Sequence, residues 1–172
     1  AFIWHQHQPL YKSREAINLN NSTGQYRLPW VRLHGTKDYL DLILILEKYP
    51  KLHQTVNLVP SLMLQLEDYA EGVAFDPYLT LALTPEAQLT EAQKQYIIQH
   101  FFDGHFHTLI EPHPRYAQLY HQRQVEGYTW CLNNWTLQDY SDLLAWHNLA
   151  WIDPIFWNDP EIETWLKQGK NF

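Results

Sequence analysis

The chain has 172 residues, 45% of them hydrophobic, and a formal net charge of -7. This length and composition suit one globular domain with a sizeable core and exclude a disordered chain. The acidic balance argues against nucleic acid or an anionic membrane as a partner, because both attract basic surfaces, and the sequence has no apolar run near the roughly 20 residues of a membrane span.

The first eleven residues combine a strand-like apolar run with a cluster of polar side chains. Phe2 to Trp4 are apolar, His5 to Gln8 are polar, and Pro9 follows. An apolar run of this kind, bounded by a proline, is typical of a buried strand of a parallel sheet. Binding residues gather at the carboxyl ends of such strands. Side chains at i and i+2 share a face of an extended chain, so we expect His5 and His7 to point the same way.

The H-x-H pair by itself leaves other interpretations open. It fits two hydrogen-bonded histidines near a strand end about as well as it fits a binding site. A metal site is a further alternative, because histidine is the commonest metal ligand. That alternative needs at least one more protein ligand, such as His, Cys, Asp or Glu.

A polar segment and then a helix follow the first strand. Lys12 to Gln25 is rich in Asn, Ser and Thr, which predicts a loop, and Arg27 to Gly35 continues it, with Trp30 expected near the entrance of a site. Thr36 to Tyr49 has the apolar spacing of a helix, with Thr36 as its cap. Pro50 ends this helix.

Gln54 to Val59 predicts a second buried strand, which Pro60 ends. A strand, a helix and a second strand form a crossover unit, so the two strands should be parallel. Asn57 is the polar residue of this strand. Its amide can bind a sugar hydroxyl, and it can equally satisfy neighbouring backbone.

The middle of the chain predicts two more helices. One begins at Ser61 and ends near Gly72, with Glu67 and Asp68 on a solvated face. After an irregular stretch from Ala74 to Leu89, Thr90 and Gln93 match a capping box for a helix over Glu91 to Phe102.

A histidine-rich stretch follows from Phe102 to Tyr120. His105, His107 and Glu111 offer a conceivable metal site, although no tight ligand template such as H-E-x-x-H is present. Arg115, in the sequence H-P-R-Y, is expected at the surface or in a lid.

The last third of the chain predicts a loop or short helix over Gln122 to Asn134 and then a long helix. Thr136 and Asp139 cap that helix, which runs from Leu137 to about Trp151 before Pro154 ends it. Its aromatic stripe is more typical of a core than of a substrate platform. A short helix containing Trp165 is expected near the end.

Three stretches of the sequence together resemble glycoside hydrolase family 57. They are F-I-W-H-Q-H-Q-P-L-Y from Phe2, V-N-L-V-P-S-L-M-L-Q-L-E-D-Y from Val56 to Tyr69, and D-L-L-A-W-H-N-L-A-W-I-D-P from Asp142 to Pro154. They occur in the family's order and at about its spacing. The resemblance implies an α/β fold: the N-terminal portion of an incomplete (β/α)7 barrel, with parallel strands joined by helical crossovers. It also implies a retaining enzyme, amylase-like or transferase-like, that acts on α-glucans in carbohydrate metabolism.

The resemblance assigns substrate-binding roles and no catalytic carboxylate. In the family a glutamate nucleophile and an aspartate acid/base lie on later strands, so we expect both downstream of residues 1–172, with this segment inactive alone. Glu111, Glu126, Asp139 and Asp153 do not match the family's catalytic motifs. His5 and His7 match its H-x-H-Q-P motif, whose histidines lie beside the reacting sugar. The predicted substrate-binding residues are His5, His7, Gln8, Trp30, Asn57 and Trp151.

Partners and alternatives follow from these assignments. We expect an α-glucan or oligosaccharide substrate, no cofactor and no metal. Cys131 is the only cysteine, which excludes an intrachain disulfide and is compatible with the cytoplasm, where we expect the protein. A non-catalytic carbohydrate-binding or vestigial domain is the alternative, and a metal-dependent deacetylase or mannosidase-like enzyme using His5 and His7 is a weaker one. An incomplete barrel should also leave an open strand edge and unpartnered apolar faces, which favour association.

Overall fold

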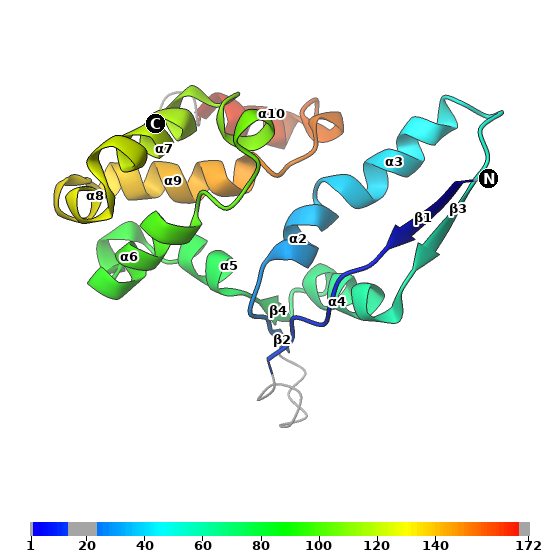
Figure 1. The fold of residues 1–172 in the computed structure, drawn as a ribbon, viewed down its shortest axis with the longest axis horizontal. Coiled ribbons are helices and arrows are strands. Elements are labelled where there is room, and N and C mark those ends of the chain that lie inside the picture. The colour runs from blue at the N-terminus through cyan, green and yellow to red at the C-terminus, as the bar shows by residue number, and fades with distance from the viewer. Residues whose placement is uncertain (1, 14–23, 169–172) are drawn as a thin grey trace. The chain divides into compact units, whose positions relative to one another are not determined.

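The computed structural model describes residues 2–13 and 24–168, and the chain divides into two compact units, Ala1–Thr80 and Leu81–Phe172 (Figure 1). The sequence alone predicted that residues 1–172 belong to one part of a single catalytic domain, without a boundary near residue 80. Most of the predicted loop from Lys12 to Gln25 lies outside the described residues.

The first unit is built on a parallel pair of strands. β1 (Phe2–Gln6) pairs with β3 (Gln54–Leu58), and His5 lies opposite Asn57 in the register. The crossover between them contains α3 (Asp38–Glu47), which runs back along the two strands (Figure 1). This confirms the predicted parallel pair with a helical crossover. The predicted burial of the two strands is wrong, because most residues of β1 and β3 are exposed. A second parallel pair, β2 (Gly24–Gln25) with β4 (Ala74–Phe75), was not predicted.

The segment before α3 differs from its prediction. Trp30–Gly35 forms helix α2, so the predicted loop over residues 27–35 is wrong. Val31 and Leu33 of α2 are each 1% exposed, and this burial stabilises a helix too short to form by itself. Thr36 does not cap α3, because its hydroxyl donates to the Leu33 carbonyl at 2.9 Å and it ends α2 instead.

Helix α4 (Pro60–Ala70) begins with proline at its first position, where the missing N–H costs nothing. Gly72 follows it with a φ of 71°, a left-handed conformation that glycine adopts readily. The prediction that Asp68 lies on a solvated face is wrong. Its carboxylate lies 3.1 Å from the Lys12 ammonium and accepts the Tyr26 hydroxyl at 2.5 Å.

A second carboxylate of the first unit is buried before α5 (Pro77–Ala82). Asp76 is 2% exposed and accepts hydrogen bonds from Arg32 Nε at 3.1 Å and from the Tyr69 hydroxyl at 2.9 Å. Its other oxygen accepts from the Leu79 N–H at 2.8 Å, which caps the helix. Apolar residues around these polar contacts complete the core of the unit: Tyr26, Val31, Leu33, Leu62, Ala74 and Tyr78.

The second unit is helical over its described residues. Its longer helices are α6 (Glu91–His100), α7 (Pro114–Glu126), α8 (Tyr128–Asn134), α9 (Leu137–Leu149) and α10 (Pro160–Gln168). Shorter turns are η1 (Glu86–Gln88), the π-helical η2 (Phe106–Ile110) and η3 (Pro154–Phe156). The predicted capping boxes of α6 and α9 are confirmed: Thr90 and Thr136 each exchange hydrogen bonds with the residue three positions on.

The core of the second unit lies between α6, α7 and α9. Among its apolar side chains that are 1% exposed or less are Ile97, Ile98, Phe101, Leu119, Leu143 and Trp146. One polar group is shared inside it. The Phe101 carbonyl accepts the Tyr116 hydroxyl at 2.6 Å, and His147 Nδ1 lies 3.1 Å from the same oxygen. This satisfies a carbonyl at the end of α6 that the helix cannot satisfy itself.

Arg115 joins two helices, so its predicted surface or lid position is wrong. Its Nε donates to Asp142 and its terminal nitrogen to Asp139, both at 2.6 Å, linking α7 to α9. The Asp142 side chain is 1% exposed and the Arg115 side chain 23% exposed.

The described residues thus form a mixed α/β structure that is mostly helical, with small parallel sheets. Within residues 2–13 and 24–168, no helix has the length and apolar character needed to cross a membrane.

Candidate functional site

The two histidines of the H-x-H motif lie at the carboxyl end of β1 and are both exposed. Their ring centroids are 5.6 Å apart, with the ring planes inclined by 36°. The two imidazoles therefore point the same way, as the alternation of an extended chain predicted. Together they present two adjacent ring systems that can donate or accept hydrogen bonds.

Asn57 lies beside this pair. It is the partner of His5 in the parallel register and is exposed, one residue before the end of β3. Gln6 points to the opposite face, where it is 6% exposed and its amide donates to the Tyr39 carbonyl of α3 at 3.4 Å. Because side chains alternate along a strand, His5 and Asn57 share the face that is turned away from this contact with α3.

Gln8 extends the polar cluster toward α4. Its side-chain oxygen accepts the Tyr11 hydroxyl at 2.8 Å, and its carbonyl accepts the Ser61 hydroxyl at 2.9 Å. Burial raises the pKa of Tyr11. Burial also raises the pKa of Tyr39, and the Gln8 side chain beside it opposes that shift in part. Both phenols therefore stay protonated and serve as neutral hydrogen-bonding groups.

Gln65 of α4 holds the segment that follows the motif, and the sequence did not reveal it. This side chain is fully buried. Its oxygen accepts the Tyr11 N–H at 2.8 Å, and its amide donates to the Pro9 carbonyl at 2.9 Å and the Ser61 carbonyl at 2.7 Å. The chain after His7 is thereby fixed to α4. The only local signal was a glutamine among leucines, L-M-L-Q-L.

The two predicted tryptophans belong to other elements of the chain. Trp30 is the first residue of α2 and is half-buried. Trp151 belongs to the second unit, where it is 6% exposed and its ring is within 3.9 Å of the position that a Cβ on Gly104 would take. So little exposed surface suits the core role that the aromatic stripe also predicted. The substrate-binding roles of both residues stay predictions.

The histidines of the second unit pair with local partners. His107 Nδ1 lies 2.8 Å from a Glu111 oxygen, with both side chains more than half exposed. His105 Nδ1 lies 3.1 Å from the Thr108 hydroxyl. Over the part of the chain that the structure describes, no three His, Cys, Asp or Glu side chains are grouped as metal ligands would be.

The sequence as a whole matches one known family. Residues 1–171 match the family described as Glycosyl hydrolase family 57. The chain belongs to glycosyl hydrolase family 57. No curated protein and no solved structure matches the chain with statistical significance.

Membership of family 57 indicates glycoside hydrolysis or glycosyl transfer as the reaction class. Glycosidases require two carboxyl groups, one of them with a raised pKa. Asp139 does not fit that role. Burial raises the pKa of Asp139, but hydrogen bonds from Thr136 and from Arg115 outweigh it and leave the pKa below its ordinary value. Asp153 is occupied as the cap of η3, where it accepts the Ile155 N–H at 2.8 Å.

Proposed function

We propose that this family 57 protein acts on α-glucans by a retaining mechanism, through hydrolysis or glucanotransfer, and that His5, His7, Gln8 and Asn57 form part of its sugar-binding surface. In this proposal β1 and β3 are neighbouring strands of an incomplete (β/α)7 barrel. The nucleophile and the acid/base are not assigned to any residue of 2–13 or 24–168.

The observation that carries the proposal is the position of three polar side chains. His5, His7 and Asn57 lie at the carboxyl ends of paired parallel strands, and His5 and Asn57 lie opposite each other in the register. Sheets with helical crossovers bind their ligands at this end. In the proposed barrel, the face turned away from α3 would line the interior, and the sugar would bind at the carboxyl-terminal end of the strands.

The chemistry of these side chains suits a reacting sugar. Imidazole and amide groups both donate and accept, so they can bind sugar hydroxyls in either sense. A fixed imidazole donor can also stabilise a neighbouring carboxylate as its charge changes during the reaction. The Gln65 contacts hold the chain after His7 in place, which reduces reorganisation when substrate binds.

The test is the release of reducing ends from soluble starch and maltoheptaose by enzyme that includes the two catalytic carboxyl groups, because residues 1–172 by themselves are expected to be inactive. We expect His7→Ala to lower kcat by about 100-fold or more, the loss typical of removing one transition-state donor. His53 is the matched control, because it is an exposed histidine immediately before β3, at the opposite end of the same sheet. His53→Ala should keep the wild-type kcat.

Two outcomes would count against the proposal. If wild-type enzyme that includes both catalytic carboxyl groups releases no sugar from either glucan, the α-glucan assignment is contradicted. Equal losses in His7→Ala and His53→Ala would remove His7 from the site. Binding of maltoheptaose without release would favour the alternative of a carbohydrate-binding domain.

A further inference from the structure

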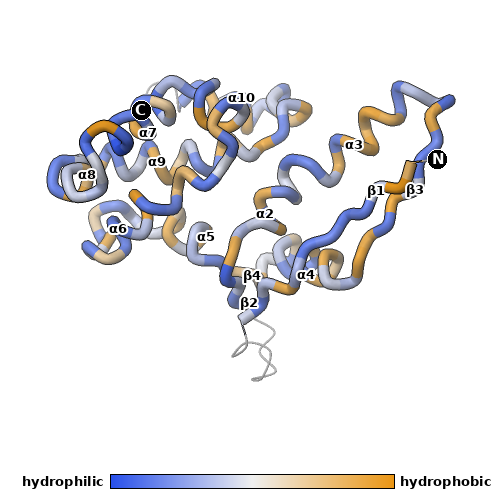
Figure 2. The backbone as a smooth tube through the Cα atoms, viewed as in Figure 1, coloured by the Kyte–Doolittle hydropathy of each residue, from blue (hydrophilic) through white to orange (hydrophobic). Residues whose placement is uncertain are grey.

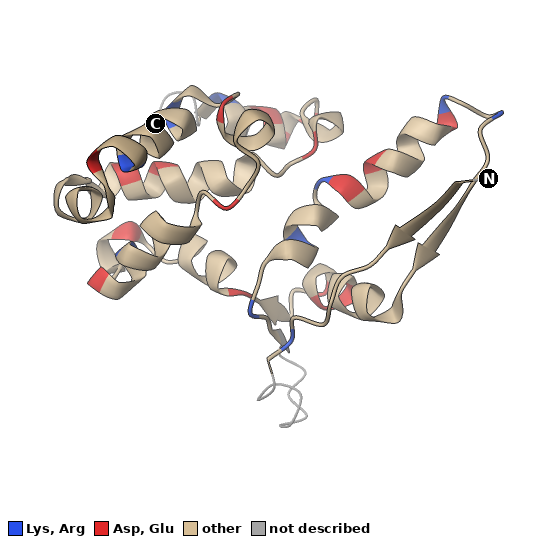
Figure 3. Ribbon diagram, viewed as in Figure 1, with Lys and Arg blue, Asp and Glu red and all other residues tan. Residues whose placement is uncertain are grey.

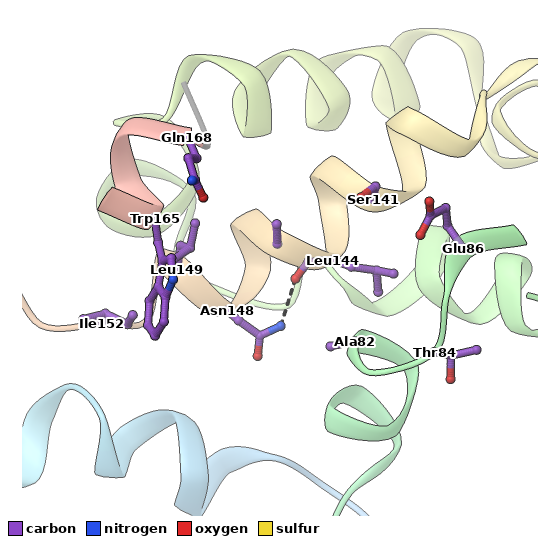
Figure 4. Close-up of a pocket in the computed structure, with 11 residues that line it drawn as sticks. Ala82, Thr84, Glu86, Ser141, Leu144, Asn148, Leu149, Ile152, Trp165 and Gln168 are labelled. Carbon is purple, nitrogen blue, oxygen red and sulfur yellow. Dashed lines mark hydrogen bonds between the residues drawn. The ribbon is translucent and has the colours of Figure 1, made fainter. Parts of the chain in front are cut away.

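The second unit contains a pocket that neither the sequence motifs nor the proposed catalytic role accounts for. Its volume is about 430 Å³, within the range of small-molecule sites. Helices α9 and α10 and the segment after α5 form its walls (Figure 4). Every lining residue lies between Ala82 and Gln168, so the pocket belongs entirely to the second unit.

One wall of the pocket is aromatic and apolar. Trp165 of α10 is 42% exposed, and its indole lies beside Leu149 and Ile152 (Figure 4). An exposed indole provides a large, flat apolar surface with a polar N–H at its edge. Such a surface matches the C–H face of a pyranose ring, which is apolar although the rim of the ring is lined with hydroxyls.

The rest of the lining supplies hydrogen-bonding groups. Asn148, Ser141, Gln168 and Glu86 all line the pocket. The Asn148 amide donates to the Leu144 carbonyl at 2.8 Å, which fixes its orientation at the wall (Figure 4). Amide, hydroxyl and carboxylate groups are the partners that sugar hydroxyls need.

We infer that this pocket binds a pyranose unit of an α-glucan chain and is a second, non-catalytic carbohydrate site. The inference rests on the proposed function for its choice of sugar. Glu86 is the one carboxylate among the described lining residues, whereas glycoside hydrolysis requires two. The pocket therefore holds a glucan chain and does not cleave it.

The experiment follows maltoheptaose binding by NMR, using the indole N–H resonance of Trp165, and by calorimetry. We expect this resonance to shift in the wild-type protein and equally in His7→Ala, whose substitution lies in the other unit. Trp165→Ala should weaken this binding about tenfold, the effect of losing one anchoring aromatic. Trp157→Ala is the matched control, because Trp157 is 38% exposed and outside the lining. It should keep wild-type affinity.

The possible results separate this inference from the proposed function. Starch turnover with no shift of the Trp165 resonance overturns the pocket and leaves the enzyme proposal intact. A shift without turnover supports the pocket and contradicts the catalytic proposal. Equal weakening by Trp165→Ala and Trp157→Ala overturns the pocket. Circular dichroism of each variant identifies a loss of fold.

Discussion

At the scale of single residues, Gln65 is the side chain on which the motif's geometry depends. It makes its hydrogen bonds to Tyr11, Pro9 and Ser61 while fully buried. We expect Gln65→Leu to leave the Pro9 carbonyl and the Tyr11 N–H without this partner and to lower the free energy of unfolding by about 2 kcal/mol. Urea unfolding measures the stability, and kcat on maltoheptaose should fall with it because His7 and Gln8 lose their support.

The control for this substitution is on the same helix. Met63 of α4 is 44% exposed, so Met63→Leu should change stability by less than about 0.5 kcal/mol. If Gln65→Leu proved as stable as Met63→Leu, the three hydrogen bonds would not be holding the segment.

Residue spacing explains what the sequence predicted of the site and what it did not. His5 and His7 are two positions apart, so their shared direction follows from strand geometry alone. Gln65 contacts residues as many as 56 positions away, and nothing local distinguishes it from a solvated helix residue. Asp68 shows the same limitation, because its partners Lys12 and Tyr26 come from distant segments.

At the scale of helices, the predictions succeeded where the signal was local and failed where packing decided. The capping boxes of α6 and α9 use residues three positions apart and were predicted correctly. Helix α2 has no side-chain cap at Pro29 and is formed by burial of Val31 and Leu33, so the sequence favoured a loop. Arg115 and Asp142 are 27 residues apart, which concealed their pairing.

The link between α7 and α9 yields a stability prediction. Arg115→Ala would leave Asp142, whose side chain is 1% exposed, as a buried charge without this partner. We expect the free energy of unfolding to fall by about 3 kcal/mol at neutral pH. Lys167→Ala is the control, since it removes an exposed i, i+4 pair with Glu163 and should cost less than about 0.5 kcal/mol. Urea unfolding of both variants measures this difference.

The same link sets the direction of the pH dependence. The pKa of Asp139 is below its ordinary value in the folded state, so its ionised form stabilises the fold above the unfolded pKa of about 4. This contribution is lost as the pH falls through the lowered pKa. The gap between wild type and Arg115→Ala should therefore narrow below about pH 4. A gap that stays constant down to pH 2 would contradict the ion-pair explanation.

At the scale of the whole molecule, the two units bury apolar surface unequally. The second unit contains most of the large, fully buried side chains, including Trp146, Tyr116 and Phe101. In the first unit, β1 keeps Phe2, Ile3 and Trp4 exposed at 66%, 74% and 51%. Figure 2 shows hydrophobic residues along β1 and β3, and Figure 3 shows that neither strand carries a Lys, Arg, Asp or Glu. The sequence predicted a buried strand here, and that prediction is wrong, because two paired strands cannot cover their own faces.

An exposed, uncharged strand predicts association. Within the described residues β1 and β3 pair only with each other, and proteins usually protect such edges with charges. We expect the wild-type chain of residues 1–172 to associate as its concentration rises, and Ile3→Lys to shift it toward the monomer in sedimentation velocity.

Leu83→Lys is the control, because Leu83 is 68% exposed but lies outside the strands. Since Ile3 is so exposed, the substitution should change stability by less than about 0.5 kcal/mol, so reduced association would reflect the strand surface and not a loss of fold. If Ile3→Lys and Leu83→Lys reduced association equally, the cause would be the net charge, because the chain's charge of -7 changes by the same amount in each variant.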